Sequence, residues 1–406
     1  MESKRRGRHA RRKLIIGNSE RPGMVLSRVT AFVFYLALGV AAAGGQASIE
    51  TPQSQPPQQQ SLRPKLNATE VSKLRVSAEG GDASAQFALG KAYEGGNGVP
   101  QNDESAVKWY RKAADQGNAE AENRLGIMYR VGQGVSRDKE EAVRWYHKAA
   151  KQGNPQAMFN LGVSYYNGDG VPSNPILAYS WFLLAQDAGN PAAEDAVKRS
   201  GEEGGRMGTP DALLQVAGMY EKGDELPQSY ADAAKWYRKA ADLSPLARVN
   251  LAALFIDGKG VPRDYGQAMT LCQGAAKQNY GPAQYCVGYL YQRGLGTPAD
   301  PKEAAKWYGQ ASKDGNRAAM MALAEMYSKG EGISINRPEA YYYLFLAHGR
   351  GAPDAQTRAQ TLWKEMSKDD IKHLERKLRD LRYDPKRVFD SMQGQTTPAV
   401  KGSSQP

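Results

Sequence analysis

The side chains best suited to chemistry are few and widely spaced. The histidines are His9, His147, His348 and His373, and the chain has only two cysteines. So few cysteines exclude a multi-cysteine metal site and a small disulfide-stapled fold. The sequence also lacks a Gly-x-Ser-x-Gly nucleophile turn, a His-Glu-x-x-His zinc motif and an EF-hand loop. We therefore predict no catalytic residue, no cofactor and no metal site.

The basic charge of the chain is concentrated at its N-terminus. The formal net charge is +11 over 406 residues, but residues 1–47 alone contain nine Lys or Arg and two Glu. An apolar run, Ala31–Gly45, follows these basic residues, and Gly45-Gln46-Ala47 has small residues where a signal peptidase cuts. Residues 1–47 are thus predicted to be a signal peptide or, as the alternative, an uncleaved N-terminal membrane anchor.

Either form of this segment predicts that the rest of the chain is exported, and so periplasmic or secreted. The membrane would be contacted only through the N-terminal segment if it stays uncleaved. Residues 48–68 are rich in Pro and Gln and are predicted to form a disordered linker. Because the remaining chain is only slightly basic, nucleic acid is not an expected partner.

The middle of the chain is an internal repeat. A Leu or Val marker recurs at steps of 36, 36, 55, 35, 36 and 36 residues. Ala always stands four residues before this marker and an aromatic residue four residues after it, which places all three on one helical face. The markers are Leu89, Leu125, Leu161, Val216, Leu251, Val287 and Leu323.

A second helix follows in every copy. A Gly-x-Gly turn, such as Gly132-Gln133-Gly134, ends the first helix in most copies, because glycine permits positive φ. Seven residues before a Trp-Tyr marker or its equivalent there is always a residue type that caps helix N-termini. These predicted caps are Asn102, Asp138, Asn174, Ser229, Asp264, Asp300 and Asn336. We call the first helix of each copy helix A and the second helix B.

The stretch AENRLGIMYRVGQGVSRDKEEAVRWYHKAAKQGN, residues 121–154, resembles the Sel-one-like repeat family, which is related to tetratricopeptide repeats. The resemblance covers about residues 77–352. It implies an all-α fold, an α-solenoid with the form of a right-handed superhelix of seven antiparallel helix-pair repeats. It also implies an adaptor or interaction scaffold, and it supplies no catalytic residues.

The single 55-residue step interrupts the array after the third repeat. We predict repeats one to three over residues 69–190, an insertion or hinge over 191–208, and repeats four to seven over 209–352. Each block ends with a similar segment, which predicts one added helix after each block. Residues 353–384 are predicted to form C-terminal capping helices, which cover the open end of a stack, and residues 385–406 a disordered tail.

Partner binding is predicted on the helix A face that lines the concave side of such a stack. The non-core positions of helix A precede the Leu marker by one residue and follow it by two and six. They carry polar, apolar and both kinds of charged side chains, which suits a protein or peptide rather than a polyanion. This predicted stripe consists of Arg124, Ile127, Asn160, Val163, Gln215, Asn250, Tyr289, Arg293, Glu325 and Lys329.

The two cysteines allow two interpretations. Cys272 occupies a core position in helix B of repeat five, and Cys286 lies on helix A of repeat six. The two helices are antiparallel about a turn near Tyr280, so a disulfide is possible in an exported protein. The alternative is two unpaired thiols, favoured by the polar residues that other repeats have at the position of Cys286. That variability predicts that Cys286 is exposed or faces the groove.

Two classes of function remain open at this point. The first is a non-enzymatic scaffold or adaptor of the cell envelope that binds an unknown protein or peptide on the concave helix A face. The second is an envelope enzyme or enzyme inhibitor that acts on cell-wall material. An enzyme would need titratable groups that converge, whereas the predicted stripe has isolated ones.

Overall fold

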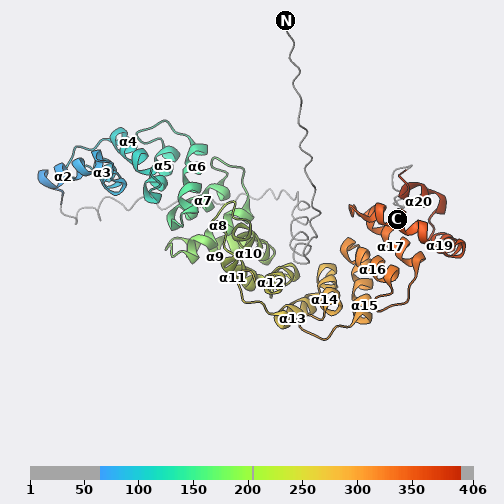
Figure 1. Cartoon of the computed structure of the whole chain (residues 1–406). Helices are drawn as coiled ribbons and strands as arrows, with labels where there is room; N and C mark the ends of the chain where they lie inside the picture. Colours follow the sequence, from blue (N-terminus) through green and yellow to red (C-terminus); the bar gives the residue numbers. More distant parts are fainter. Residues whose placement is uncertain (1–64, 204, 395–406) are drawn as a thin grey trace, which may run out of the picture. The chain divides into compact units, whose positions relative to one another are not determined.

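The structure is a computed structural model that describes residues 65–203 and 205–394, except the side chains of 202–208. Every regular element in these ranges is an α-helix, and consecutive helices pack in antiparallel pairs (Figure 1). The repeats are formed by α3 (Ala83–Gly95) with α4 (Asp103–Ala114), α5 (Ala119–Val131) with α6 (Lys139–Lys151), α7 (Pro155–Asn167) with α8 (Pro175–Asp187), α10 (Gly205–Lys222) with α11 (Tyr230–Ala240), α12 (Pro245–Asp257) with α13 (Tyr265–Ala276), α14 (Gly281–Arg293) with α15 (Pro301–Lys313), and α16 (Arg317–Lys329) with α17 (Arg337–Gly349).

The predicted caps begin every helix B. In α6, for example, the Asp138 carboxylate accepts a hydrogen bond from the backbone N–H of Glu141 at 2.9 Å. The other six predicted caps accept the same bond from the residue three positions on. Each bond satisfies one of the N–H groups that a helix N-terminus leaves without a partner.

The turn between the two helices of a repeat contains two glycines with different roles. Gly132 ends α5 with a φ of 80°, a left-handed conformation that a side chain disfavours. Gly134, with a φ of 66°, lies directly against the backbone of Asp103, the first residue of helix B in the preceding repeat. A Cβ atom at Gly134 would clash with that backbone, so this turn is also a contact between repeats.

Helices A and B of one repeat approach each other where glycine faces an aromatic ring. A Cβ atom added at Gly90 would lie 2.7 Å from the ring of Tyr110, and Gly288 has the same relation to Tyr308. Tyr110 and Tyr308 are almost fully buried. In repeats one, two, three and six the core is therefore an aromatic ring that packs across a glycine and is surrounded by small alanines and an aliphatic residue.

Additional helices lie at the ends of the two blocks. α2 (Ala68–Glu79) precedes repeat one and packs on α3, and α9 (Ala193–Glu203) follows repeat three and packs on α8. α18 (Ala355–Glu365), α19 (Lys368–Asp380) and α20 (Pro385–Met392) follow repeat seven and share a core with α17. The sequence had predicted an added helix at the positions of α9 and α18.

Two predicted boundaries are wrong. Residues 385–392 were assigned to a disordered tail, but they form α20, which is capped by Asp384 and buries Val388 and Met392 against the C-terminal core. The predicted linker extended to residue 68, but α2 begins there, capped by Asn67. The predicted leader 1–47, most of the linker and the end of the tail lie outside the described residues, as do parts of the predicted hinge.

None of the described helices combines the length and the apolar character that a membrane span requires.

Candidate functional site

The structure separates the ten residues of the predicted stripe into accessible and buried groups. Six are partly or fully exposed and can contact a partner: Arg124, Ile127, Gln215, Arg293, Glu325 and Lys329. The other four are buried, with exposed fractions of 9% or less: Asn160, Val163, Asn250 and Tyr289. The expectation that the whole stripe is accessible is therefore wrong for these four.

Contacts between successive A helices explain the burial of two of these residues, Asn160 and Tyr289. The Asn160 side chain on α7 donates a 2.9 Å hydrogen bond to the side-chain oxygen of Asn123 on α5. Tyr289 lies on α14, which packs against α12 of the preceding repeat, and burial raises the pKa of its hydroxyl. These side chains join repeats to one another and are not available to a partner.

Three residues of the stripe come together on α14 and α16. Lys329 donates a 2.5 Å hydrogen bond to Glu325, and Arg358 of α18 lies 3.7 Å from the other oxygen of this carboxylate. The hydrogen bond from Lys329 lowers the pKa of Glu325, with further lowering by the charges of Arg358 and Arg293, while burial opposes the shift. We call Arg293, Glu325, Lys329 and Arg358 the Arg293 cluster. Glu331 lies 4.0 Å from Lys329, so the cluster has three cations beside two carboxylates and an excess of one positive charge.

Arg358 was missed in the sequence analysis, although a signal for it was present. One more step of 36 residues from Ala322 leads to Arg358, the position that Arg124 occupies in repeat two. Ala355 and Trp363 then fall where helix A has its invariant Ala and its aromatic residue. α18 is therefore the helix A of an incomplete eighth repeat, and it extends the accessible stripe by one helix.

At the other end of the array, Arg124 of α5 lies 3.6 Å from Glu94 of α3. Glu94 also accepts a 2.5 Å hydrogen bond from the hydroxyl of Tyr110. Burial and the adjacent carboxylate both raise the pKa of this hydroxyl. Arg124 is thus held by a network that connects two helices A with the core of repeat one.

Cys272 of α13 and Cys286 of α14 are joined by a disulfide in the structure, with their Cα atoms 6.0 Å apart. Both side chains are fully buried. The expectation that Cys286 is exposed or faces the groove is wrong, because α13 covers it. Cys272 stands where most other repeats have the aromatic residue of the core, so in repeat five the bond to Cys286 takes the place of that ring.

The turn of repeat four has a carboxylate where the other six repeats have the second turn glycine. Glu225 occupies the position of the second turn glycine, and its carboxylate lies 3.2 Å from Nδ1 of His147 on α6. The other ring nitrogen of His147 is 3.5 Å from the hydroxyl of Tyr165. The hydrogen bond with His147 lowers the pKa of Glu225, against the effect of burial. This group connects repeats two, three and four.

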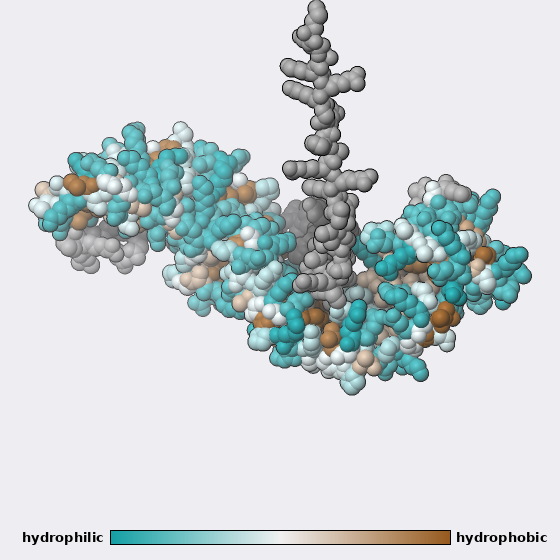
Figure 2. Space-filling view, in the orientation of Figure 1, coloured by the Kyte–Doolittle hydropathy of each residue, from teal (hydrophilic) through white to brown (hydrophobic). Residues whose placement is uncertain are grey.

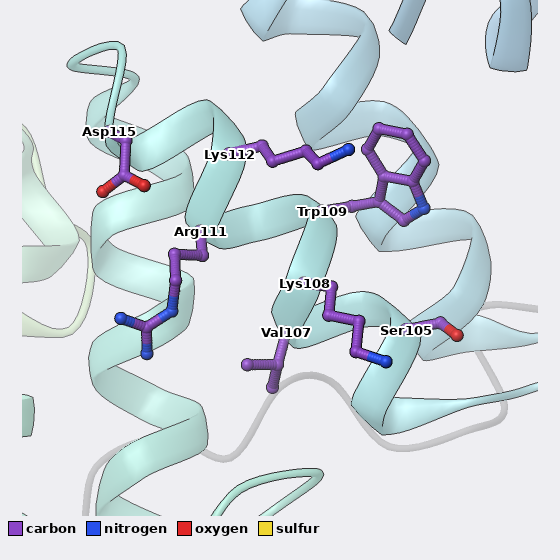
Figure 3. Close-up of a pocket in the computed structure, with 7 residues that line it drawn as sticks. All are labelled: Ser105, Val107, Lys108, Trp109, Arg111, Lys112 and Asp115. Atoms are coloured by element: carbon purple, nitrogen blue, oxygen red, sulfur yellow. The ribbon is translucent and has the colours of Figure 1, made fainter. Parts of the chain in front are cut away.

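A shallow hollow of about 430 Å³ lies along α4 and contains Trp109 (Figure 3). The Lys112 ammonium lies 4.2 Å from the centre of the Trp109 ring. In Figure 3, Lys108 and Ser105 point to the same side of α4 as Trp109, while Val107 and Arg111 point to the other. α4 therefore presents an aromatic ring between two lysines.

No chemical centre stands out elsewhere in the described part of the chain. It contains no group of three or more His, Cys, Asp or Glu residues that could hold a metal ion. On the face shown in Figure 2, hydrophilic residues cover most of the repeats and hydrophobic ones are scattered. The accessible features are charged clusters on helices, which suit recognition of another molecule.

Tandem antiparallel helix pairs, joined by glycine turns and stacked through a shared core, define an α-solenoid repeat protein. The family model described as Sel1 repeat matches residues 83–118, 119–154, 155–190, 210–244, 245–280, 281–316 and 317–347. These matches cover more than half of the chain, so the chain belongs to the Sel1 repeat family. Sel1 repeats are a scaffold type used in protein interactions.

Several known proteins are similar to this chain. An alginate biosynthesis protein, AlgK of Azotobacter vinelandii, is 33% identical over 119 residues, which are 29% of this chain and 25% of AlgK. The chain thus matches only a quarter of that relative's length. Chitin synthase regulatory factor 3 of Schizosaccharomyces pombe is 33% identical over 22% of this chain and 10% of its own.

A solved structure with an SLR fold, a protective antigen of uropathogenic Escherichia coli, is 30% identical. The match covers 80% of this chain and 68% of that one, with a TM-score of 0.41.

Proposed function

We propose that this protein is exported and acts in the cell envelope as a non-enzymatic scaffold that binds a peptide or protein through its accessible helix A surface. The observation that carries the proposal is the Arg293 cluster, in which three successive helices A present charged side chains to one place. Because cations exceed carboxylates there, the favoured partner is a protein segment with exposed carboxylates. The partial similarity to AlgK, a protein named for alginate biosynthesis, supports a role connected with polysaccharide synthesis.

Export is supported by two independent features. The basic leader with its apolar run predicts secretion, and the Cys272–Cys286 bond is of a kind that persists in oxidising compartments. A periplasmic reporter enzyme fused after Ala47 should be active outside the cytoplasm. Activity of a cytoplasmic reporter in the same fusion, with residues 1–47 attached, would contradict export.

Partner binding is tested with two double variants that remove equal charge. Arg293→Ala with Lys329→Ala removes two cations of the Arg293 cluster, whereas Lys368→Ala with Lys372→Ala removes two exposed lysines of α19. We expect proximity labelling from the exported protein to lose specific partners only with the first variant. Loss of interface anchors commonly weakens binding about ten- to hundredfold. Equal labelling by both variants would contradict the assignment to helix A.

A further inference from the structure

In three repeats the core tyrosine of helix B donates a hydrogen bond from its hydroxyl to a side chain of helix A. Tyr110 donates to Glu94 at 2.5 Å in repeat one, and Tyr237 donates to Glu221 at 2.5 Å in repeat four. In each case the acceptor is the residue that follows the aromatic residue of helix A, and in repeat six it is Gln292. This position of helix A therefore supplies the acceptor that a buried tyrosine hydroxyl requires.

Repeat two has an arginine at this position. The Tyr146 hydroxyl and Nε of Arg130 are both buried, and neither has a hydrogen-bond partner in the described part of the chain. Burial raises the pKa of the Tyr146 hydroxyl to about 12, and the adjacent charge of Arg130 partly opposes this shift. A guanidinium has only donors, so it cannot accept a hydrogen bond from the hydroxyl. Two buried donors thus lie together without an acceptor.

The polar side chains around this pair have other partners. The carboxylate of Asp169, in the turn of repeat three, is close enough for its charge to act on the tyrosine, but it is bonded to Lys139. The Asn160 side chain on α7 is bonded to Asn123 at 2.9 Å and to Gln156 at 3.3 Å. Neither group supplies the missing acceptor.

Repeat four shows which group is missing in repeat two. Both repeats have the same tyrosine in helix B and the same asparagine on the next helix A. They differ at one position, where repeat four has a carboxylate and repeat two has a cation. The corresponding residues are Tyr237, Glu221 and Asn250 in repeat four and Tyr146, Arg130 and Asn160 in repeat two.

The surface of α5 beside this pair is accessible and apolar. Arg130 and Ile127 are partly exposed, and Val131 has an exposed fraction of 50%. A glutamate carries its carboxylate on a flexible stem, so it can reach a buried hydroxyl while its own chain packs on these apolar residues. A uronate carries its carboxylate directly on a sugar ring, which is too broad to enter between two buried groups. The surroundings therefore favour a polypeptide over a polyuronate.

We propose that Arg130 and Tyr146 bind the carboxylate of a glutamate or aspartate of a polypeptide partner, in the place that Glu221 fills in repeat four. Tyr146 donates a hydrogen bond to this carboxylate, and Arg130 pairs with its charge. The site rests on the proposed function, because it requires a polypeptide on the helix A surface, and it adds an anchor in repeat two. It is made of other repeats than the Arg293 cluster, so either site can be lost without the other.

The probe for this site is octaglutamate labelled with fluorescein, and its binding is measured by fluorescence anisotropy. The reference protein is the whole exported protein with Arg293→Ala and Lys329→Ala, which keeps this test separate from that of the Arg293 cluster. We expect Arg130→Glu to weaken binding at least about fivefold, because the introduced carboxylate accepts from Tyr146 and repels the probe.

The matched control is Arg376→Glu, the same change at an exposed arginine of α19. It should alter the affinity less than about twofold, because exposed charges at a distance are screened by salt. No binding of octaglutamate to the reference protein, or an equal loss with Arg130→Glu and Arg376→Glu, would overturn the proposal.

Two conservative variants test the hydroxyl itself. Tyr146→Phe should weaken binding of octaglutamate about threefold and should not lower the midpoint of urea unfolding, because the lost hydroxyl had no acceptor. Tyr237→Phe should lower that midpoint without weakening binding, because it removes the hydrogen bond to Glu221. If Tyr146→Phe lowers the midpoint as Tyr237→Phe does, Tyr146 has an acceptor within the chain and the proposal is overturned.

A fluorescein-labelled octamer of a uronate tests the other source of carboxylates. We expect this octamer to bind the reference protein and its Tyr146→Phe variant with the same affinity. A loss with Tyr146→Phe as large as that of octaglutamate would place a sugar carboxylate at this hydroxyl and overturn the assignment to a polypeptide.

Discussion

The junctions between most repeats differ in one respect from the junction between repeats three and four. At the regular junctions, the second turn glycine lies against the first residue of the preceding helix B, as Gly170 does on Lys139 and Gly260 on Tyr230. Repeat four follows the extra helix α9, and Glu225 occupies this position. Glu225 does not adopt a positive φ and bonds instead with His147 of α6.

The difference shows what the second glycine is for. Where the turn must approach a neighbouring backbone, only a residue without a side chain fits. Where the inserted helix changes the path of the chain, a charged side chain can occupy the same position and form a different contact. The close packing between regular repeats therefore requires the second glycine, whereas the conformation of the turn does not.

The largest expected effect comes from filling a regular junction. Gly170→Ala should destabilise the protein by about 3 kcal/mol, because the new Cβ atom meets the backbone of Lys139 in addition to the cost of positive φ. Gly153→Ala is the matched control, since Gly153 has a φ of 86° but open space around it. It should cost about 1 kcal/mol. If urea unfolding gives equal losses of unfolding free energy for the two variants, the positive φ and not the contact at the junction is what requires glycine at position 170.

A second, smaller effect tests the core of the repeats. Gly126→Ala brings a Cβ atom against the ring of Tyr146 and should cost about 2 kcal/mol. Repeat four accommodates Ala217 at the equivalent position, where Ala217→Gly should cost about 1 kcal/mol through backbone entropy rather than a clash. Adding Tyr146→Leu to Gly126→Ala should recover part of the loss, because repeat seven combines Ala324 with Leu344. Additive losses in this double-mutant cycle would contradict a direct contact.

The smallest effects distinguish two carboxylates by their dependence on pH. Burial raises the pKa of Glu122, a regular position where repeat one has Gln86. Burial favours the protonated form of Glu122. The free-energy cost of burying its charge therefore grows as pH rises from its pKa in the unfolded chain through its pKa in the folded protein. The pKa of Glu225 is lowered, so its stabilisation is present above the unfolded pKa and is lost as pH falls through the folded one.

Glu122→Gln should therefore stabilise the protein at about pH 6.5, and Glu225→Gln should destabilise it, each by under about 1 kcal/mol. Both differences should shrink towards about pH 3.5, as the two carboxylates become protonated. Urea unfolding of the two variants at both pH values measures the differences. Changes of the same sign at about pH 6.5 would be inconsistent with opposite pKa shifts of the two carboxylates.

Much of the fold follows from local patterns in the sequence. The caps such as Asp138 and the turn glycines such as Gly132 act within a few residues, so spacing alone identifies them. The recurring Ala, Leu and aromatic positions predict which residues of each helix A are buried, because residues four apart lie on one face of a helix. The 36-residue step also extends to Arg358, although this was recognised only in the structure.

The accessible surface was harder to predict, because it depends on how neighbouring helices pack. Asn160 and Tyr289 occupy the same kinds of position as Arg124 and Ile127, yet adjacent A helices bury them. The prediction for Cys286 is wrong for the same reason. Polar residues at the equivalent position of other repeats do not show which helix covers that position in repeat six. α20 was missed because Val388 and Met392 are too few to produce a helical period in so short a segment.

The Cys272–Cys286 bond gives the array an unequal resistance to mechanical force. In a solenoid each repeat contacts mainly its neighbours, so a pull on the two ends would peel repeats away one at a time. The bond closes the loop from Cys272 to Cys286, a sequence separation of 14, and this loop could not be extended under such a pull. Under tension the array would thus lengthen in discrete steps, and the step that includes repeats five and six would be shorter in oxidised than in reduced protein.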